Sequence, residues 1–142
     1  MESRKKKILA VDDVRETLLA LKIRLEYAGY EVITAEDGEK GLKLARELKP
    51  DLIILDVMLP KIDGFSVCRL LKFDEDYEDI PIIMLTAKGA EKDKETGQQV
   101  GADVYLTKPY NSKELMHWVE KLTSGIHAGP SLKKILHPKS DN

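Results

Sequence analysis

The sequence predicts a three-layer α/β fold in which a five-stranded parallel β-sheet is covered by helices on both faces. Five short apolar runs, each too short for a helix and rich in Ile, Val and Leu, alternate with segments whose apolar residues recur every three or four positions. A regular alternation of strands and helices favours a parallel sheet with right-handed crossovers. The predicted strands are residues 7–11, 31–35, 52–55, 82–85 and 103–106.

Three of these runs belong in the middle of the sheet. The first (KILAV), the third (LIIL) and the fourth (IIML) are apolar almost without alternation. A strand that is covered on both faces has this pattern. We therefore expect the first, third and fourth strands to be central.

The helices are predicted from apolar spacing and from start and stop signals. The first carries one apolar stripe and ends at Gly29, a common C-terminal stop. Residues 91–101 have only a weak stripe and contain Gly97, so this helix should be the least stable. The apolar markers are Val14, Leu18, Leu21, Leu25 and Ala28 for the first helix, Leu42, Ala45 and Leu48 before Pro50 for the second, Phe65, Cys68 and Leu71 for the third, and Leu115, Val119 and Leu122 behind Ser112 as N-cap for the last.

Length and charge narrow the class of protein. The 142 residues suit one domain, which we place at residues 1–123, with residues 124–142 as a linker or partly disordered tail. Lys and Arg number 23 against 25 Asp and Glu, a net charge of -2 that argues against direct nucleic-acid binding. The apolar runs fall short of the roughly 18 residues of a membrane span, and the N-terminus lacks a signal-peptide core. We expect a cytoplasmic protein that does not contact a membrane.

Polar side chains follow four of the predicted strands. Asp12 and Asp13 come after the first, Asp56 after the third, Thr86 after the fourth and Lys108 after the fifth. Ligands of parallel α/β sheets bind beyond the carboxyl ends of the strands. Three carboxylates, a hydroxyl and an ammonium group should therefore meet at one edge of the sheet.

Three neighbouring carboxylates raise one another's pKa values, and a hard divalent cation removes this cost. Mg²⁺ prefers oxygen ligands and keeps several waters, which leaves room for a phosphoryl oxygen. Each residue also has a structural alternative. Asp12 or Asp13 can cap the first helix, Asp56 can start a loop, Thr86 can continue a strand, and Lys108 can be an exposed lysine.

The residues Asp12-Asp13, "LDVMLPKIDG", "MLTAK" and "GADVYLTKPY" together resemble the receiver domain of bacterial two-component response regulators, from about residue 6 to residue 123. The resemblance implies a flavodoxin-like fold with strand order 2-1-3-4-5. It also implies a signalling switch, not an enzyme of many turnovers, that takes a phosphoryl group from a sensor histidine kinase or a phosphotransfer protein.

Carried over by position, the resemblance makes Asp56 the phosphoacceptor. It implies that Mg²⁺ is bound by Asp13, Asp56 and the carbonyl of Met58, with Asp12 supporting the metal through water. Lys108 and Thr86 would receive the phosphoryl oxygens, and Thr86 and Tyr105 would form the switch. The family pattern also favours a cis Lys108–Pro109 bond. The bulk of Met58 and Lys88 beside the site predicts slow self-dephosphorylation.

The chain departs from the receivers it resembles most, which are attached to winged-helix DNA-binding domains. Those receivers carry a second acid after "GAD" and an arginine in the last helix for a salt-bridged dimer face. Val104 and Trp118 stand at these positions here. We expect Val104, Tyr105 and Trp118 to form an apolar patch for an effector or a second copy, with Lys94 and Glu114 pairing across this face. Trp118 can instead pack against the core.

Other functions remain as alternatives. The chain can be the receiver fragment of a longer regulator with a DNA-binding or enzymatic output. A Mg²⁺-dependent phosphatase of the haloacid dehalogenase type is disfavoured, because the position of its second acid holds Met58. A nucleotide-binding module would need a loop rich in glycine or hydroxyl groups after the first strand, where "VDDVRE" stands. A binding module that is never phosphorylated would not need the acids, Thr86 and Lys108 together.

Overall fold

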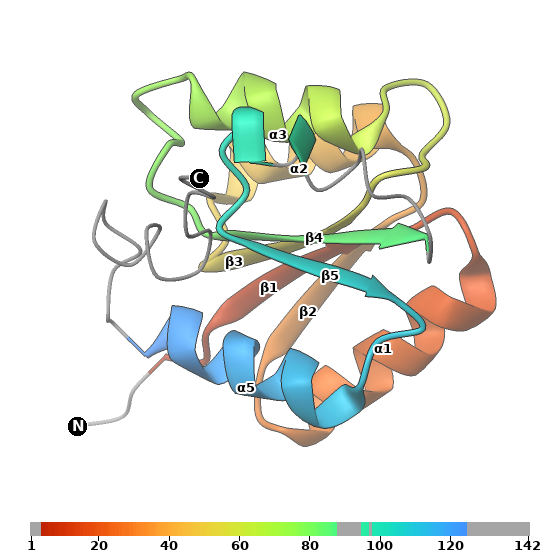
Figure 1. Cartoon of the computed structure of the whole chain (residues 1–142). Helices are drawn as coiled ribbons and strands as arrows, with labels where there is room; N and C mark the ends of the chain where they lie inside the picture. The colour runs from red at the N-terminus through yellow and green to blue at the C-terminus, as the bar shows by residue number, and fades with distance from the viewer. Residues whose placement is uncertain (1–3, 88–94, 97, 125–142) are drawn as a thin grey trace, which may run out of the picture.

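The computed structural model describes residues 4–87, 95–96 and 98–124. In this part of the chain, a parallel five-stranded sheet lies between two layers of helices, with α1 and α5 on one face and α2 and α3 on the other (Figure 1). The elements are β1 (Lys7–Val11), α1 (Arg15–Tyr27), β2 (Glu31–Ala35), α2 (Gly38–Leu48), β3 (Leu52–Asp56), α3 (Gly64–Lys72), β4 (Ile82–Ala87), β5 (Val104–Lys108) and α5 (Ser112–Thr123).

The strand order is β2-β1-β3-β4-β5, and every neighbouring pair is parallel. This confirms the flavodoxin-like α/β fold and the central position of β1, β3 and β4. The first two strands have the predicted bounds. The other three extend one or two residues further at their carboxyl ends, so that Asp56, Thr86 and Lys108 lie within strands rather than after them. Parallel pairing continues through these polar residues because each neighbouring strand offers its backbone groups there.

Two apolar cores hold the layers together. Because side chains alternate along a strand, β1 sends Ile8 and Ala10 to the α1/α5 core and Leu9 and Val11 to the α2/α3 core. The stripe on α1 is shorter than the sequence predicts. Leu18, Leu21 and Leu25 are buried, but Val14 and Ala28 are exposed, because they lie just outside the helix as its caps.

The helix ends agree with the sequence in part. Gly29 follows α1 with φ of 100°, a conformation that favours glycine. Ser112, expected as N-cap of the last helix, is instead its first residue. Asn111 is the N-cap, and its side-chain oxygen accepts the N–H groups of Lys113 and Glu114 at 2.8 and 3.2 Å. An amide reaches these two donors as readily as a hydroxyl does, so both residue types were suitable caps.

Three further expectations concern single features. The Lys108–Pro109 peptide bond is cis, as the family pattern favours. Cys68 is fully buried in the α2/α3 core, as a small apolar residue would be. Of the weak helix predicted over residues 91–101, residues 95, 96, 98 and 99 are helical, while residues 91–94 and 97 lie outside the described residues. None of the described helices is long and apolar enough to cross a membrane.

Candidate functional site

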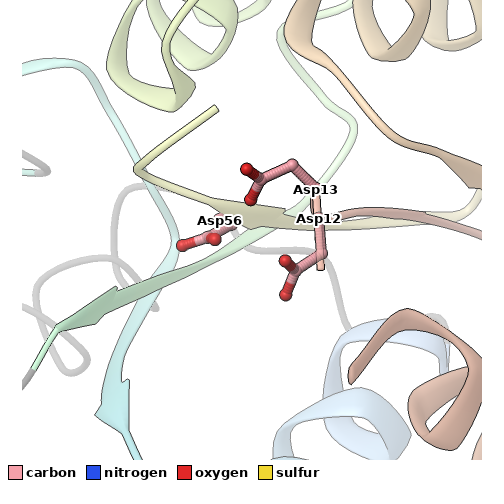
Figure 2. Close-up of side chains that lie close together, drawn as sticks. All are labelled: Asp12, Asp13 and Asp56. Atoms are coloured by element: carbon pink, nitrogen blue, oxygen red, sulfur yellow. The ribbon is translucent and has the colours of Figure 1, made fainter. Parts of the chain in front are cut away.

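Three carboxylates meet at the carboxyl edge of the sheet. Asp12 and Asp13 follow β1, and Asp56 is the last residue of β3. Each residue offers one carboxylate oxygen such that the three oxygens lie within 4.8 Å of one another (Figure 2). Asp12 is 2% and Asp56 6% exposed, whereas Asp13 is exposed. The convergence expected from the sequence is therefore present.

The alternation of the strands brings Lys108 to the same place. Ala10, Ile54 and Leu106 all pack into the α1/α5 core, and the residue two positions further along each strand is Asp12, Asp56 or Lys108. A strand repeats its side-chain direction every second residue. These three polar side chains therefore continue the α1/α5 face of the sheet past the end of its core.

Lys108 joins the two buried acids. Its Nζ lies 3.0 Å from Oδ2 of Asp12 and 3.2 Å from Oδ2 of Asp56. The sequence suggested the contact with Asp56 but not the shorter one with Asp12. Asp12 also accepts the backbone N–H of Val14 at 3.0 Å, which ties it to the start of α1. Neither acid caps the helix as the capping alternative supposed, because Val14 is the N-cap of α1 and no side-chain capping hydrogen bond is present there.

The environment shifts the pKa values of Asp56 and Lys108. Burial raises the pKa of Asp56, the Lys108 charge opposes this rise, and the Asp12 charge adds to it. A backbone hydrogen bond from Met58 also favours the ionised Asp56. Burial acts to lower the pKa of Lys108, but the hydrogen bond to Asp12 and the charges of Asp56 and Asp12 outweigh it, so the net shift is upward. Lys108 is thus a firmly charged group beside a carboxylate that is costly to ionise.

Thr86 and Tyr105 lie on neighbouring strands. Thr86 is only 1% exposed and sits beside Thr107 in the register, while Tyr105 sits beside Met84. Met84 belongs to the α2/α3 core, and Tyr105 is partly buried against it. Since side chains repeat every second residue, Thr86 and Tyr105 share the α2/α3 face of the sheet. They are diagonal neighbours on this face, because Tyr105 pairs with Met84 and Thr86 lies two residues further along β4.

A cleft of about 670 Å³ is lined by Asp56, but not by Asp12 or Asp13. Its floor includes Asp56 and Lys108, and the side chain of Met58, 71% exposed, lies at its rim. Its lining also includes Arg24 and other residues of α1, together with Pro109, Tyr110 and Ser112. Asp56 is therefore reached from solvent through a cleft bounded by α1 and the start of α5.

The apolar patch expected for a partner differs from the structure at Val104, which is buried, and at Trp118, which is only partly exposed. Val104 is 4% exposed and belongs to the α1/α5 core, because β5 directs this residue inward in register with Ile83. Trp118 is partly buried against the same core, the alternative that the sequence left open. Glu114 is exposed. Lys94 and its expected pairing with Glu114 lie outside the described residues.

Sequence reasoning missed the residues that hold the loop after Asp56. Gly64 packs so closely on the Asp56 backbone that a Cβ there would overlap the Asp56 carbonyl oxygen. Gly38, at the start of α2, packs in the same way on the Ile62 carbonyl oxygen. The Asp-Gly pairs that begin α2 and α3 are the signal that both helices start against the same loop.

Comparison with known proteins identifies the family. The sequence matches the response regulator receiver domain over residues 8–120. The chain belongs to this family. In this chain Asp12, Asp13 and Asp56 lie together at one edge of the sheet, and Lys108 contacts Asp12 and Asp56.

Among similar proteins, the alkaline phosphatase synthesis transcriptional regulatory protein PhoP of Bacillus subtilis is 53% identical over 110 residues, which cover 78% of this chain and 45% of that protein. The DNA-binding dual master transcriptional regulator RpaA of Synechocystis is 51% identical over 116 residues, 82% of this chain and 48% of that protein. This receiver chain spans about half the length of these curated relatives.

Solved structures agree. A putative response regulator from Chloroflexus aurantiacus has a TM-score of 0.81 and 36% identity, over 85% of this chain and 99% of that chain. The receiver domain of a sensor histidine kinase from Pseudomonas aeruginosa, with a magnesium ion in its active site cleft, has a TM-score of 0.78 and 30% identity over 85% of this receiver and 99% of that chain.

Proposed function

We propose that this receiver is a phosphorylation-activated switch in which Asp56 accepts a phosphoryl group from a histidine kinase or a phosphotransfer protein. One observation carries the proposal. The Asp56 carboxylate stands in an open cleft, 3.2 Å from the Lys108 ammonium group and within reach of two further carboxylates. A nucleophile, a fixed positive charge and an acidic cluster are what transfer of a phosphoryl group to a carboxylate requires.

The donor set fits Mg²⁺. All the nearby ligand atoms are oxygens, and the burial that raises the pKa of Asp56 is a cost that a bound cation would offset. Asp13 and Asp56 would hold the ion directly, together with the Met58 carbonyl, and Asp12 would act through water. Bound there, Mg²⁺ would neutralise charge that develops on the phosphoryl oxygens.

The chain's own groups account for the transfer. A carboxylate oxygen of Asp56 attacks the phosphorus of a phosphohistidine, a P–O bond forms, and the P–N bond breaks with its electron pair leaving on the imidazole. Little covalent help is needed, so positioning and charge dominate catalysis. Lys108 then moves from its acidic partners to a phosphoryl oxygen as a point charge. The Thr86 hydroxyl, near the end of the adjacent strand, donates a hydrogen bond to a second phosphoryl oxygen.

Phosphorylation adds nearly two negative charges and new acceptor oxygens. Thr86 would shift toward them, and Tyr105 would repack on the face that it shares with Thr86. The surface around β5 and α5 would then bind an effector or a second copy of the chain. Similarity to RpaA and PhoP, which are named as transcriptional regulators, favours a receiver attached to a DNA-binding output. That the receiver itself contacts no nucleic acid remains a prediction.

The test uses acetyl phosphate as phosphodonor and intact mass spectrometry as readout. We expect one phosphoryl group per chain in the presence of Mg²⁺, and none after chelation or in Asp56→Asn. Asp79→Asn, a change at an exposed acid on the loop before β4, is the matched control and should be labelled like the wild type. Full labelling of Asp56→Asn would refute the proposal. Continuous hydrolysis of the donor over many turnovers would instead favour the phosphatase alternative.

A further inference from the structure

The loop from Val57 to Asp63 is tied to Asp56 at both of its ends. At its start, the Met58 backbone hydrogen-bonds the Asp56 carboxylate. At its far end, the N–H of Gly64 donates to the Val57 carbonyl at 2.8 Å, and Gly64 lies directly against the Asp56 backbone. A displacement of this loop therefore moves the groups that surround the Asp56 side chain.

The middle of the loop is a strained turn. The N–H of Ile62 donates to the carbonyl of Pro60 at 2.8 Å, two residues back, and Lys61 between them has φ of 71°. This is a γ-turn with positive φ, a rare conformation for a residue with a side chain. A strained turn persists only where surrounding structure holds it.

The first turn of α2 supplies that support. The N–H of Gly38 donates to the Pro60 carbonyl at 3.1 Å. This carbonyl therefore accepts hydrogen bonds from Gly38 of α2 and from Ile62 of the turn. A Cβ on Gly38 would overlap the Ile62 carbonyl oxygen, which is backbone and cannot turn aside as a side chain would. Lys61 also lies 3.8 Å from Asp37 and 3.7 Å from Glu39, but these ion pairs are exposed and weak.

We propose that Gly38 is a positioning residue for the metal site. Because Gly38 has no side chain, the Pro60–Ile62 turn can pack directly against the start of α2. This packed (seated) turn holds the loop that positions the Asp56 carboxylate and the Met58 backbone. This inference rests on the proposed function, since it assigns Gly38 a role in Mg²⁺ binding there. Gly38 touches neither metal nor phosphoryl group and acts through the loop.

The experiment compares Gly38→Ala with Gly29→Ala. Both changes add one methyl group, but Gly29 has φ of 100° and nothing within 4 Å of an added Cβ, so its alanine variant strains the backbone at the opposite edge of the sheet. Mg²⁺ affinity is measured by isothermal titration calorimetry, with thermal unfolding in parallel. We expect Gly38→Ala to bind Mg²⁺ at least about tenfold more weakly than Gly29→Ala, which should match the wild type. Equal affinities in the two variants would overturn the inference.

A second measurement needs only the wild type, in case Gly38→Ala does not fold. Hydrogen exchange of the Gly38 amide reports opening of its bond to Pro60. If the site requires the seated turn, Mg²⁺ at about 100 times its Kd should slow this exchange by up to about 100-fold. An unchanged rate at saturating Mg²⁺ contradicts the inference. If the wild type instead binds no Mg²⁺ and takes up no phosphoryl group, the proposed function itself fails.

Discussion

The ammonium group of Lys72 lies 2.7 Å from the carboxylate of Asp103, and the two side chains are 4% and 0% exposed. Lys72 also donates to the carbonyls of Glu78 and Ile80 at 3.0 and 2.6 Å, and Asp103 accepts the N–H of Ile82 at 2.8 Å. The pair joins the end of α3, the segment before β4 and the start of β5. It anchors the strand that carries Lys108 at the end away from the acids.

Removing the cation of this pair should destabilise the fold strongly. Lys72→Met leaves the Asp103 carboxylate buried without its partner, which typically costs about 3–5 kcal/mol. Urea unfolding followed by circular dichroism measures the loss. Lys43→Met, at an exposed position of α2, is the control and should change the free energy of unfolding by less than about 0.5 kcal/mol. A loss below about 1 kcal/mol in Lys72→Met would show that water compensates the buried charge.

Asp56→Asn should make the chain more stable at neutral pH. Burial, the Lys108 charge and the Asp12 charge together leave the pKa of Asp56 raised above 3.8 in the folded state. A raised carboxyl pKa stabilises the folded state below the unfolded pKa, and this stabilisation is lost as pH rises through the folded value. The ionised wild type thus bears a cost at pH 7 that Asn removes.

The difference in urea midpoint between Asp56→Asn and the wild type should therefore shrink as the pH falls through the pKa of Asp56. Asp79→Asn provides the comparison, because its exposed side chain should give nearly equal midpoints throughout. If Asp56→Asn is less stable than the wild type at pH 7, the attraction of Lys108 outweighs the cost of burial.

Asp13 should matter for the metal more than for the fold. Its side chain is exposed, whereas Asp12 bonds both Lys108 and the N–H of Val14. We expect Asp13→Asn to weaken Mg²⁺ binding by more than the roughly 10- to 100-fold typical of an outer-shell change. Its thermal unfolding should stay near that of the wild type.

Calorimetric titration with Mg²⁺ checks this prediction for Asp13. Glu36→Gln, which removes an exposed partner of Arg15 on the neighbouring β2–α2 connection, is the control and should keep its affinity within about twofold. Unchanged binding in Asp13→Asn would exclude this carboxylate as a ligand.

Trp118 should act mainly as a packing residue. It is partly buried against the α1/α5 core. Its ring and that of His117 are in a T-shaped arrangement, with their centroids 4.9 Å apart. Trp118→Ala should cost about 1–3 kcal/mol, less than the 3–5 kcal/mol of a fully buried aromatic. Tyr27→Ala, at a residue 94% exposed, should cost almost nothing by the same urea measurement. If Trp118→Ala and Tyr27→Ala both leave the free energy of unfolding almost unchanged, Trp118 does not stabilise the core, and a role as a surface residue that binds a partner is favoured.

The sequence predicted the sheet well because its strands are separated, short and apolar. Residues 7–11 and 31–35 matched β1 and β2, and the acids and Lys108 met where the rule for parallel sheets places ligands. The strand order came only from the resemblance to receivers. Apolar periodicity does not say which strands are neighbours.

What the sequence could not give depends on three-dimensional partners. Val104 looked available for a partner, but the register beside Ile83 turns it inward. The buried position of Lys72 was not predicted, although its spacing of four from buried Cys68 places it on the core side of α3. The role of Gly38 was not predicted, because its contact with Ile62 joins residues that no local pattern connects.

The last helix ends far from Asp56. The hydroxyl of Thr123 lies 3.2 Å from that of Tyr30, and Tyr30 immediately precedes β2, whose first residue is beside Lys7. A five-residue strand is roughly 17 Å long, so the end of α5 beside Tyr30 and the three acids are about one strand length apart. Whatever is joined beyond Thr123 is attached at the opposite pole from the phosphorylation chemistry. A change at Asp56 must therefore travel the length of the sheet to reach it, and β5 and α5 are two elements that extend over this distance.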